Sequence, residues 1–513
     1  MCKRRADNLM SRSCNFNCML KNQKKFKNFF NLLDKNKNLE ERLCIAQKAL
    51  SFATYNNVGC FVSNVLENFY CDIAESLPVD NIPQTYEPDT VLHVMTLSHL
   101  IGGHTRVVEK WINLAPERQK HSVALLNQTC EIPKKLKDNV KNKNGELYIF
   151  NPNDDIIKKA EKLRKLAAGF EYVVLHIHMD DPCALIAFGT EKFRRPVLFF
   201  NHADHLFWIG KSISDVVLDF RTIKSITKAR RGVKTPYLLG IPPEMEIAYA
   251  KPCDKSLLRA ELNLPKDKKI ILTVGSNFKF TPFKNKSFID YAIKILNKEQ
   301  SALLYAIGPS MEDKMWKEGC EQTNGRIVPL GAISYGEKYF KYLQAADLIL
   351  DSWPMSGGTV VMDAILFNKP VLSLDNEIGQ LDYVIKSKSF AKTQEEFIEK
   401  ALKLLESRSA AQEFVEDLKK NYLIENDFKL WQERLRILQE TMPKIHVVKR
   451  DFSDDIYNID DYVLSLSMFK SEMQCTKNPC TMFFHYFKYL LYKYVINNKK
   501  RKIHYQELFI SDL

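Results

Sequence analysis

The feature that most constrains this fold is a series of short, almost wholly apolar segments that alternate with amphipathic helical segments. A first series lies between residues 90 and 242, with apolar segments at 90–97, 121–127, 146–150, 171–178, 196–200 and 215–220. A second lies between residues 268 and 441, with apolar segments at 269–276, 302–308, 326–331, 347–352 and 370–374. Strands that are apolar along their whole length are typical of parallel sheets covered by helices on both faces. The sequence therefore predicts an α/β protein with two Rossmann-like domains that face a cleft.

Three further segments complete the predicted organisation. Residues 38–86 predict a pair of helices, because helical periodicity is interrupted at Asn56-Asn57 and ends before Pro78, the first of three prolines. Within the second domain, residues 393–441 are mainly helical and suit helices that pack back across the domain pair. Residues 1–37 form a basic N-terminal segment and residues 442–513 form a C-terminal tail, and the charge of both ends predicts that they are tails at the surface.

The positive charge of the chain is concentrated at its ends. The net charge is +13; residues 1–38 hold ten Lys/Arg and two Asp (+8), and residues 477–502 hold seven Lys/Arg and no acid (+7). The remaining residues therefore carry 13 − 8 − 7 = −2. A nucleic-acid-binding core would carry its own basic face, so this balance argues against nucleic acid as a partner.

The C-terminal tail contains an aromatic and basic stretch. Residues 482–496 read MFFHYFKYLLYKYVI, and four cations follow at 499–502. The stretch is short for a span of about 20 apolar residues, so it predicts a helix lying on an anionic membrane surface through 482–502, or a helix docked on the protein itself. The N-terminus lacks the order of a signal peptide, and the twelve cysteines lack CxxC pairs. We therefore expect a cytoplasmic protein with reduced thiols, attached peripherally to the inner membrane face if the tail binds lipid, and no metal site.

Histidines cluster in the first predicted domain. Eight of the eleven lie between His93 and His205, and several follow predicted strands. Strand ends of a parallel sheet converge on one crevice, where an imidazole or carboxylate can act as a general base. Any one histidine can equally be a core or surface residue. The candidates for the base are His104, Asp180, Asp181, His202, Asp204 and His205.

Two turns in the second domain suit a diphosphate. Ser276, Asn277 and Lys279 follow its first predicted strand, where backbone and hydroxyl donors and an ammonium can bind phosphate oxygens. Residues 356–359 read Ser-Gly-Gly-Thr between a strand and a helix, which presents N–H groups and a hydroxyl to an anion. Asp363, one turn into that helix, can accept hydrogen bonds from ribose hydroxyls. The alternative is a solvated lysine in a structural loop.

The segment from Ala346 to Asp363, with the pattern A-D-x-x-L-D-x-x-P-x-x-G-x-T-x-x-M-D, resembles the donor site of O-linked N-acetylglucosamine transferases and their bacterial N-glycosyltransferase relatives. N-F-K-x-x-P at 277–282 and RRPVLFFNHADHLFWIG at 194–210 resemble further segments of that family. The resemblance implies a GT-B fold, a UDP-sugar donor and inversion at the anomeric carbon. It assigns Lys279 and Thr359 to the diphosphate, Asp363 to the ribose, and the backbone at Ile333 and Ser334 to the nucleobase. From the turn itself we expect N–H groups at Gly357 and Gly358 to add to the diphosphate contact, and because such donors can replace a metal ion we expect no required cofactor. The family's histidine and second threonine are Gly358 and Val360 here, so N–H groups would carry more of the phosphate contact.

These observations predict a glycosyltransferase that moves a sugar from a nucleotide diphosphate to a glycan, a lipid-linked glycan or a protein. One alternative is a nucleotide-sugar epimerase on the same fold, which needs no second substrate. Another is a catalytically silent, membrane-attached protein that binds nucleotide sugars. Fold analogy alone does not separate these functions.

Overall fold

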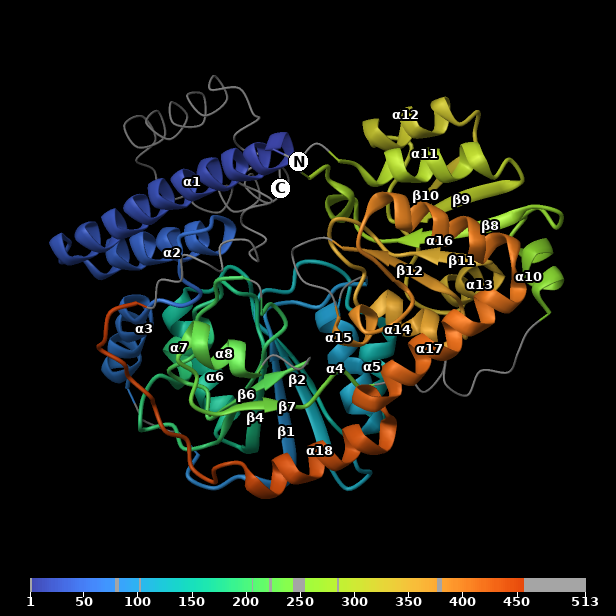
Figure 1. The fold of residues 1–513 in the computed structure, drawn as a ribbon. Helices are drawn as coiled ribbons and strands as arrows, with labels where there is room; N and C mark the ends of the chain where they lie inside the picture. The colour runs from blue at the N-terminus through green and yellow to red at the C-terminus, as the bar shows by residue number, and fades with distance from the viewer. Residues whose placement is uncertain are drawn as a thin grey trace.

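The computed structural model describes residues 2–78, 83–100, 103–204, 206–220, 224–242, 254–283, 286–375 and 381–455, with backbone only for 2–18 and 224–226. Within these ranges the chain forms two α/β domains joined by C-terminal helices (Figure 1). The chain is α/β with two parallel sheets, as the alternation of apolar segments and helices predicts.

The first domain is built on a seven-stranded parallel sheet in the order β3-β2-β1-β4-β5-β6-β7. Its strands are β1 Glu87–Met95, β2 Lys120–Leu125, β3 Leu147–Ile149, β4 Phe170–His176, β5 Val197–Phe200, β6 Val216–Asp219 and β7 Pro236–Leu238. The helices of this domain are α4 Gly103–Leu114, α5 Lys134–Asn142, α6 Ile156–Ala167, α7 Cys183–Phe188 and α8 Lys224–Arg231. The strand order reverses between β1 and β4, which is the Rossmann arrangement.

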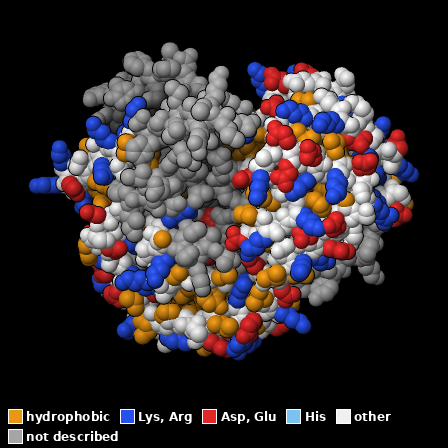
Figure 2. Space-filling view, in the orientation of Figure 1, with side chains coloured by type: hydrophobic (Ala, Val, Ile, Leu, Met, Phe, Trp, Pro, Cys, Tyr) orange, Lys and Arg blue, Asp and Glu red, His pale blue; other side chains and the backbone are white. Residues whose placement is uncertain are grey.

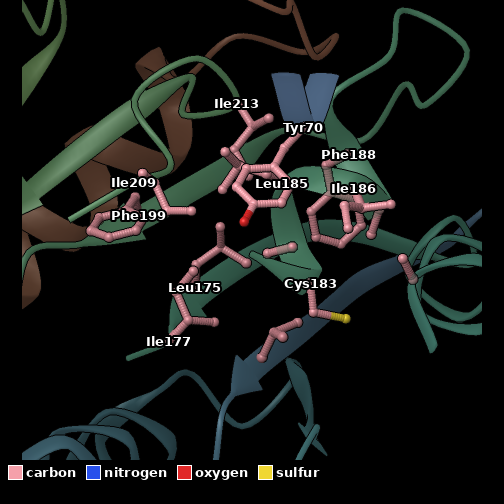
Figure 3. Close-up of a cluster of buried hydrophobic side chains, with 14 of the residues drawn as sticks. Tyr70, Leu175, Ile177, Cys183, Leu185, Ile186, Phe188, Phe199, Ile209 and Ile213 are labelled. Atoms are coloured by element: carbon pink, nitrogen blue, oxygen red, sulfur yellow. The ribbon is translucent and has the colours of Figure 1, made fainter. Parts of the chain in front are cut away.

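Both faces of the first sheet are buried, because its strands are apolar at odd and even positions alike. On one face Leu175 and Phe199 pack against α7 and the helix α3 (Asn64–Ser76), and Figure 3 shows Tyr70 of α3 among side chains of α7. On the other face Val174 and Leu198 pack against Trp111 of α4. Within the sheet, β4 pairs with β1 and with β5, which places the ends of these three strands beside one another.

The second domain is built on a six-stranded parallel sheet in the order β10-β9-β8-β11-β12-β13. Its strands are β8 Lys269–Val274, β9 Ala302–Ile307, β10 Ile327–Gly331, β11 Leu348–Leu350, β12 Val371–Leu374 and β13 Phe390–Ala391. Around them lie α10 Lys255–Glu261, the 3-10 helix η1 Asn277–Phe280, α11 Phe288–Lys298, α12 Lys314–Gln322, α13 Glu337–Ala345, α14 Thr359–Leu366 and α15 Asp382–Ile385. This order also reverses once, between β8 and β11.

The last described helices connect the two domains: α16 Gln394–Glu406, α17 Arg408–Asn426 and α18 Phe428–Thr441. Helix α17 packs on the second domain, and α18 continues beneath the first (Figure 1). There the Trp431 ring meets the Trp111 ring edge-on at 6.0 Å, and Tyr237 donates to the carbonyl of Arg434 over 2.6 Å. The helices of 393–441 thus cross from one domain to the other.

The N-terminal helices lie against the first domain. They are α1 Cys2–Lys35, α2 Leu39–Tyr55 and α3 Asn64–Ser76, of which the last two lie in the range predicted for a helix pair. The basic N-terminal segment differs from a charged tail, because Met19, Phe26 and Leu33 are buried. Their seven-residue spacing places these side chains on one face of α1, and the Phe26 ring meets the Phe207 ring at 5.8 Å.

The first part of the C-terminal tail also packs on the first domain. The His446 ring is buried between Asp215 and the carbonyl of Phe188, at 2.8 and 2.9 Å. Lys211 binds Asp451 at 3.0 Å. The aromatic and basic stretch at 482–502 lies outside the described residues. Within the described ranges, no helix is both long and apolar enough to cross a membrane.

The described surface carries mixed charge. On the face drawn in Figure 2, lysine and arginine side chains of the second domain are interspersed with aspartate and glutamate. Over the coloured atoms of that face no basic stripe follows a groove, in line with the near-neutral charge of the chain between its basic ends.

Candidate functional site

The predicted site residues gather where the strand order of each sheet reverses. In the second domain, Lys279 follows β8 and the Ser-Gly-Gly-Thr turn follows β11, and these two strands are adjacent. In the first domain, His104 follows β1, Asp180 follows β4 and His202 follows β5. Ligands of open α/β sheets bind at such reversal points, beyond the carboxyl ends of the strands.

Lys279 lies in a tight turn that directs its side chain to the Ser-Gly-Gly-Thr turn at 356–359. Its Nζ donates to the carbonyl of Ser356 over 3.1 Å. Desolvation by burial lowers the pKa of Lys279, partly offset by the nearby Asp351 carboxylate. Ser276 and Asn277, before it, are exposed, and the Asn277 amide donates to Asp313. Lys279 is thus a half-buried cation with one neutral acceptor, a suitable environment for an added phosphate oxygen.

The buried carboxylate of Asp351 holds the Ser-Gly-Gly-Thr turn in place. One of its oxygens accepts from the amide of Gly357 over 2.6 Å, and the other accepts from the hydroxyl of Ser356 over 2.7 Å. Gly358 has φ 58°, a left-handed conformation that favours glycine, and it precedes the first residue of α14. The turn therefore presents the N-terminus of α14, with the Thr359 hydroxyl, to the space between the domains.

An arginine of the first domain reaches this turn across the domain boundary. Arg106 of α4 donates to the Thr359 hydroxyl over 3.2 Å and binds the Asp363 carboxylate over 3.4 Å. Its guanidinium stacks on the Tyr335 ring, 3.9 Å from the centroid. Arg106 and Lys279 thus place two cations beside the Ser-Gly-Gly-Thr turn, one from each domain.

Asp363 has no exposed surface and several partners. In addition to Arg106, its carboxylate lies 3.8 Å from Nζ of Lys110 and accepts from the hydroxyls of Tyr339 and Tyr335, over 3.1 and 3.4 Å. In this arrangement a ribose hydroxyl would compete with Arg106 for the carboxylate. The assignment of Asp363 to the ribose stays a prediction.

The loop predicted to hold the nucleobase borders this group. Ile333 and Ser334 lie between β10 and α13, Ile333 half-buried against the domain core and Ser334 exposed. The hydroxyl of Tyr335, the next residue, donates to Asp363, and its ring stacks with the Arg106 guanidinium. Tyr335 therefore connects the loop at 333–334 to Asp363 and Arg106.

The first-domain histidines form one continuous group. His202 stacks on His104 with 4.0 Å between centroids, and His104 meets His178 at 5.6 Å. Burial lowers the pKa of His104 to about 3, and burial together with the neighbouring histidines holds the pKa of His202 well below its usual value. His104 and Arg106 both belong to the first turn of α4, so one helix terminus carries a member of the histidine group and the arginine that contacts Thr359.

The carboxylate candidates for the base have other partners. Asp180 accepts from the Ser51 hydroxyl of α2 over 3.0 Å, and Asp181 accepts from the Thr96 hydroxyl over 2.7 Å. Asp204 is buried, and its carbonyl accepts from Arg231 over 3.0 Å. His205 lies outside the described residues. Of the described candidates, His104 and His202 stack on each other. Among the described residues, no group of three or more potential ligands could hold a metal ion.

Known proteins are similar to this chain in structure. HepE of Anabaena, solved in complex with UDP and glucose, aligns with a TM-score of 0.52 and 14% identity over 68% of this chain and 99% of its own. A glycosyltransferase of Rickettsia africae aligns with 0.51 and 12% identity over 70% and 99%. The O-GlcNAc transferase of Thermobaculum terrenum covers 84% of each chain at 14% identity, with a TM-score of 0.48. No protein-family model and no curated protein sequence matches.

The chain has the GT-B fold. Two Rossmann-like sheets, each with one reversal of strand order, and helices that return from the second domain to the first define this architecture in the described residues. At identities this low the likeness shows the fold alone, and function has to be argued from the site.

Some residues of this candidate site were not predicted from the sequence. Arg106 lies in the amphipathic helix TRVVEKWI, where an arginine reads as a surface residue, although its position just after Gly102-Gly103 was a usable signal. Asp351 ends a strand and reads as a surface acid. His93, His121 and His176 were part of the histidine cluster, but their contacts depend on strand order.

Proposed function

We propose that this protein is an inverting glycosyltransferase that uses a UDP-sugar donor bound mainly on the second domain. The observation that carries the proposal is the pair of cations, Lys279 and Arg106, placed on either side of the Ser-Gly-Gly-Thr turn at the domain boundary. A diphosphate leaving group develops negative charge as the glycosidic bond breaks. Preorganised cations and N–H donors at that position stabilise the charge in the transition state.

The second domain would hold the nucleotide through the residues predicted from the sequence. Lys279, Gly357, Gly358 and Thr359 would bind the diphosphate. Ser276 and Asn277 would lie at the edge of the turn that holds Lys279. Ile333 and Ser334 would border the nucleobase, and Asp363 would bind the ribose once Arg106 turns from the carboxylate to the phosphate. HepE, on a similar fold, was solved with UDP and glucose, which supports a UDP-sugar as the first donor to test.

In the first domain, His202 would act as the general base. It would take the proton of an acceptor hydroxyl or amide while the acceptor atom attacks the anomeric carbon from the face opposite the diphosphate. The carbon–oxygen bond to the β-phosphate breaks, and its electron pair leaves with UDP. The proton then passes from His202 to solvent. The acceptor class would be a glycan, a lipid-linked glycan or a protein side chain.

The direct test is incubation with a panel of labelled UDP-sugars, with and without cell membranes and soluble protein as acceptors. Transfer of label to an acceptor, with release of UDP, supports the proposal. A changed sugar nucleotide from donor alone would instead identify an epimerase. UDP binding without turnover on any fraction would identify a binding protein. His202→Ala should bind UDP normally in calorimetry and lose most transfer; equal loss of both would contradict its assignment as base.

A further inference from the structure

A row of hydrogen-bonded imidazoles crosses the first sheet and ends at His202. His121 Nδ1 lies 3.0 Å from His93 Nε2, His93 Nδ1 lies 3.1 Å from His176 Nε2, and His176 Nδ1 lies 2.9 Å from His202 Nε2. The four residues come from β2, β1, β4 and the loop after β5, which neighbour one another in that order. The row therefore runs diagonally over one face of the sheet, from inside the domain to the domain boundary.

The row is isolated from other polar groups along most of its length. His93, His121 and His176 have no exposed surface. The Trp111 ring meets His93 edge-on at 5.5 Å and His176 at 6.1 Å, and Phe200 stacks on His176 at 5.6 Å. Burial lowers the pKa of His121 and His176 to about 3. Each imidazole in the row is therefore neutral at physiological pH, with one N–H and one bare nitrogen.

The inner end of the row sets the direction of all its hydrogen bonds. Nε2 of His121 lies 3.4 Å from Oε1 of Gln119, an atom that also accepts from the amide of Gln439 on α18 over 3.3 Å. An oxygen can only accept, so His121 carries its proton on Nε2 and leaves Nδ1 bare. The bare Nδ1 of His121 then needs a donor, so His93 carries its proton on Nε2. By the same reasoning His176 and then His202 also carry their protons on Nε2.

We infer that Gln119 and the three buried histidines fix His202 as its Nε2–H tautomer, which keeps Nδ1 of His202 bare to accept the acceptor's proton. In the described part of the chain no residue hydrogen-bonds to that Nδ1. This inference rests on the proposed role of His202 as base and names its positioning residues. The row orients the base but does not carry the proton away, because it ends at an amide oxygen that does not take a proton at neutral pH.

Substitutions at Gln119 test the direction of the row. Gln119→Glu keeps an oxygen acceptor and should retain turnover to within about threefold. Gln119→Leu removes the acceptor and leaves the buried N–H of His121 unsatisfied, which shifts the tautomer ratio about 100-fold (about 2.7 kcal/mol) toward the reversed row. A ratio of about 10:1 then becomes about 1:10, so kcat should fall about tenfold with KM for the donor unchanged. The control is Val91→Ala, which loosens the apolar layer beside His121 but removes no hydrogen-bonding group of the row, and it should keep kcat. Equal effects of Leu and Glu, or a larger loss with Glu, would overturn the inference.

A spectroscopic measurement tests the inference separately from activity. In full-length protein labelled with ¹⁵N-histidine, the His202 signals, assigned by their loss in His202→Ala, should show a protonated Nε2 and a bare Nδ1. Gln119→Leu should add signals of the Nδ1-protonated form. Protonated Nδ1 in the unaltered protein refutes the row even if transfer occurs. The expected tautomer in a protein without transfer on any donor would retain the row and refute the proposed function.

Discussion

The contact of Arg106 with Asp363 predicts a specific loss of stability when the arginine is removed. Arg106→Gln deletes the guanidinium from a carboxylate with no exposed surface, 3.4 Å away. Breaking one side of a buried ion pair costs roughly 3 to 5 kcal/mol. Lys110 at 3.8 Å and the Tyr339 hydroxyl at 3.1 Å still contact the carboxylate, and they should reduce the loss in free energy of unfolding by about 1 to 2 kcal/mol. The expected loss is about 2 to 3 kcal/mol. If the two joined domains unfold together, their unfolding entropy is about 1 kcal/mol/K, so Tm should fall by about 2 to 3 °C.

The chain supplies a matched control on its surface. Arg118 and Asp89 form an ion pair of nearly the same length, 3.5 Å, but their side chains are 72% and 44% exposed. Exposed pairs contribute at most about 1 kcal/mol, so Arg118→Gln should leave Tm almost unchanged. Thermal unfolding by circular dichroism and calorimetry compares the two variants with the unaltered protein. A similar small change in both would refute the view that Arg106 joins the two domains at Asp363.

Four further predictions follow from the site and the chain ends. Lys279→Ala should lose roughly 10² to 10³ in rate with its circular dichroism intact, because the leaving group loses a charge-assisted contact; a fall below about threefold would reject that role. Asp363→Asn should weaken UDP binding about tenfold in calorimetry, and unchanged affinity would make Asp363 structural only. Burial raises the pKa of Asp219 to about 6 from 3.8, so its ionisation destabilises the folded protein increasingly between about pH 4 and pH 6 and fully above pH 6; Asp219→Asn should stabilise the protein at pH 8 and lose that advantage by about pH 4 in unfolding titrations. A chain ending at Asp455 should fold and show less salt-sensitive sedimentation with anionic vesicles than the full chain, whereas one ending at Met442 also loses the buried His446; vesicle binding equal to that of the full chain would exclude a membrane role for 482–502.

The sequence alone determined the two-sheet architecture. Apolar runs such as 171–178 and 269–276 are local signals, and their alternation with amphipathic helices is enough to predict parallel sheets buried on both faces. The turns at Lys279 and at 356–359 were found the same way, because a small polar turn between a strand and a helix is a local feature. The buried stripe of Met19, Phe26 and Leu33 was also present in the sequence, but the basic residues around it favoured a tail.

Only the tertiary structure decided which of these residues meet. Arg106 and Thr359 are 253 positions apart, and their contact depends on how the two domains face each other. The histidine row depends on β1 lying between β2 and β4, since alternation along a strand predicts which face a side chain occupies but not which strand is its neighbour. The direction of the row depends in turn on Gln439, which α18 brings to Gln119 from 320 residues away. Local periodicity determines elements, whereas a site built from several strand ends is determined by the order in which those strands pair.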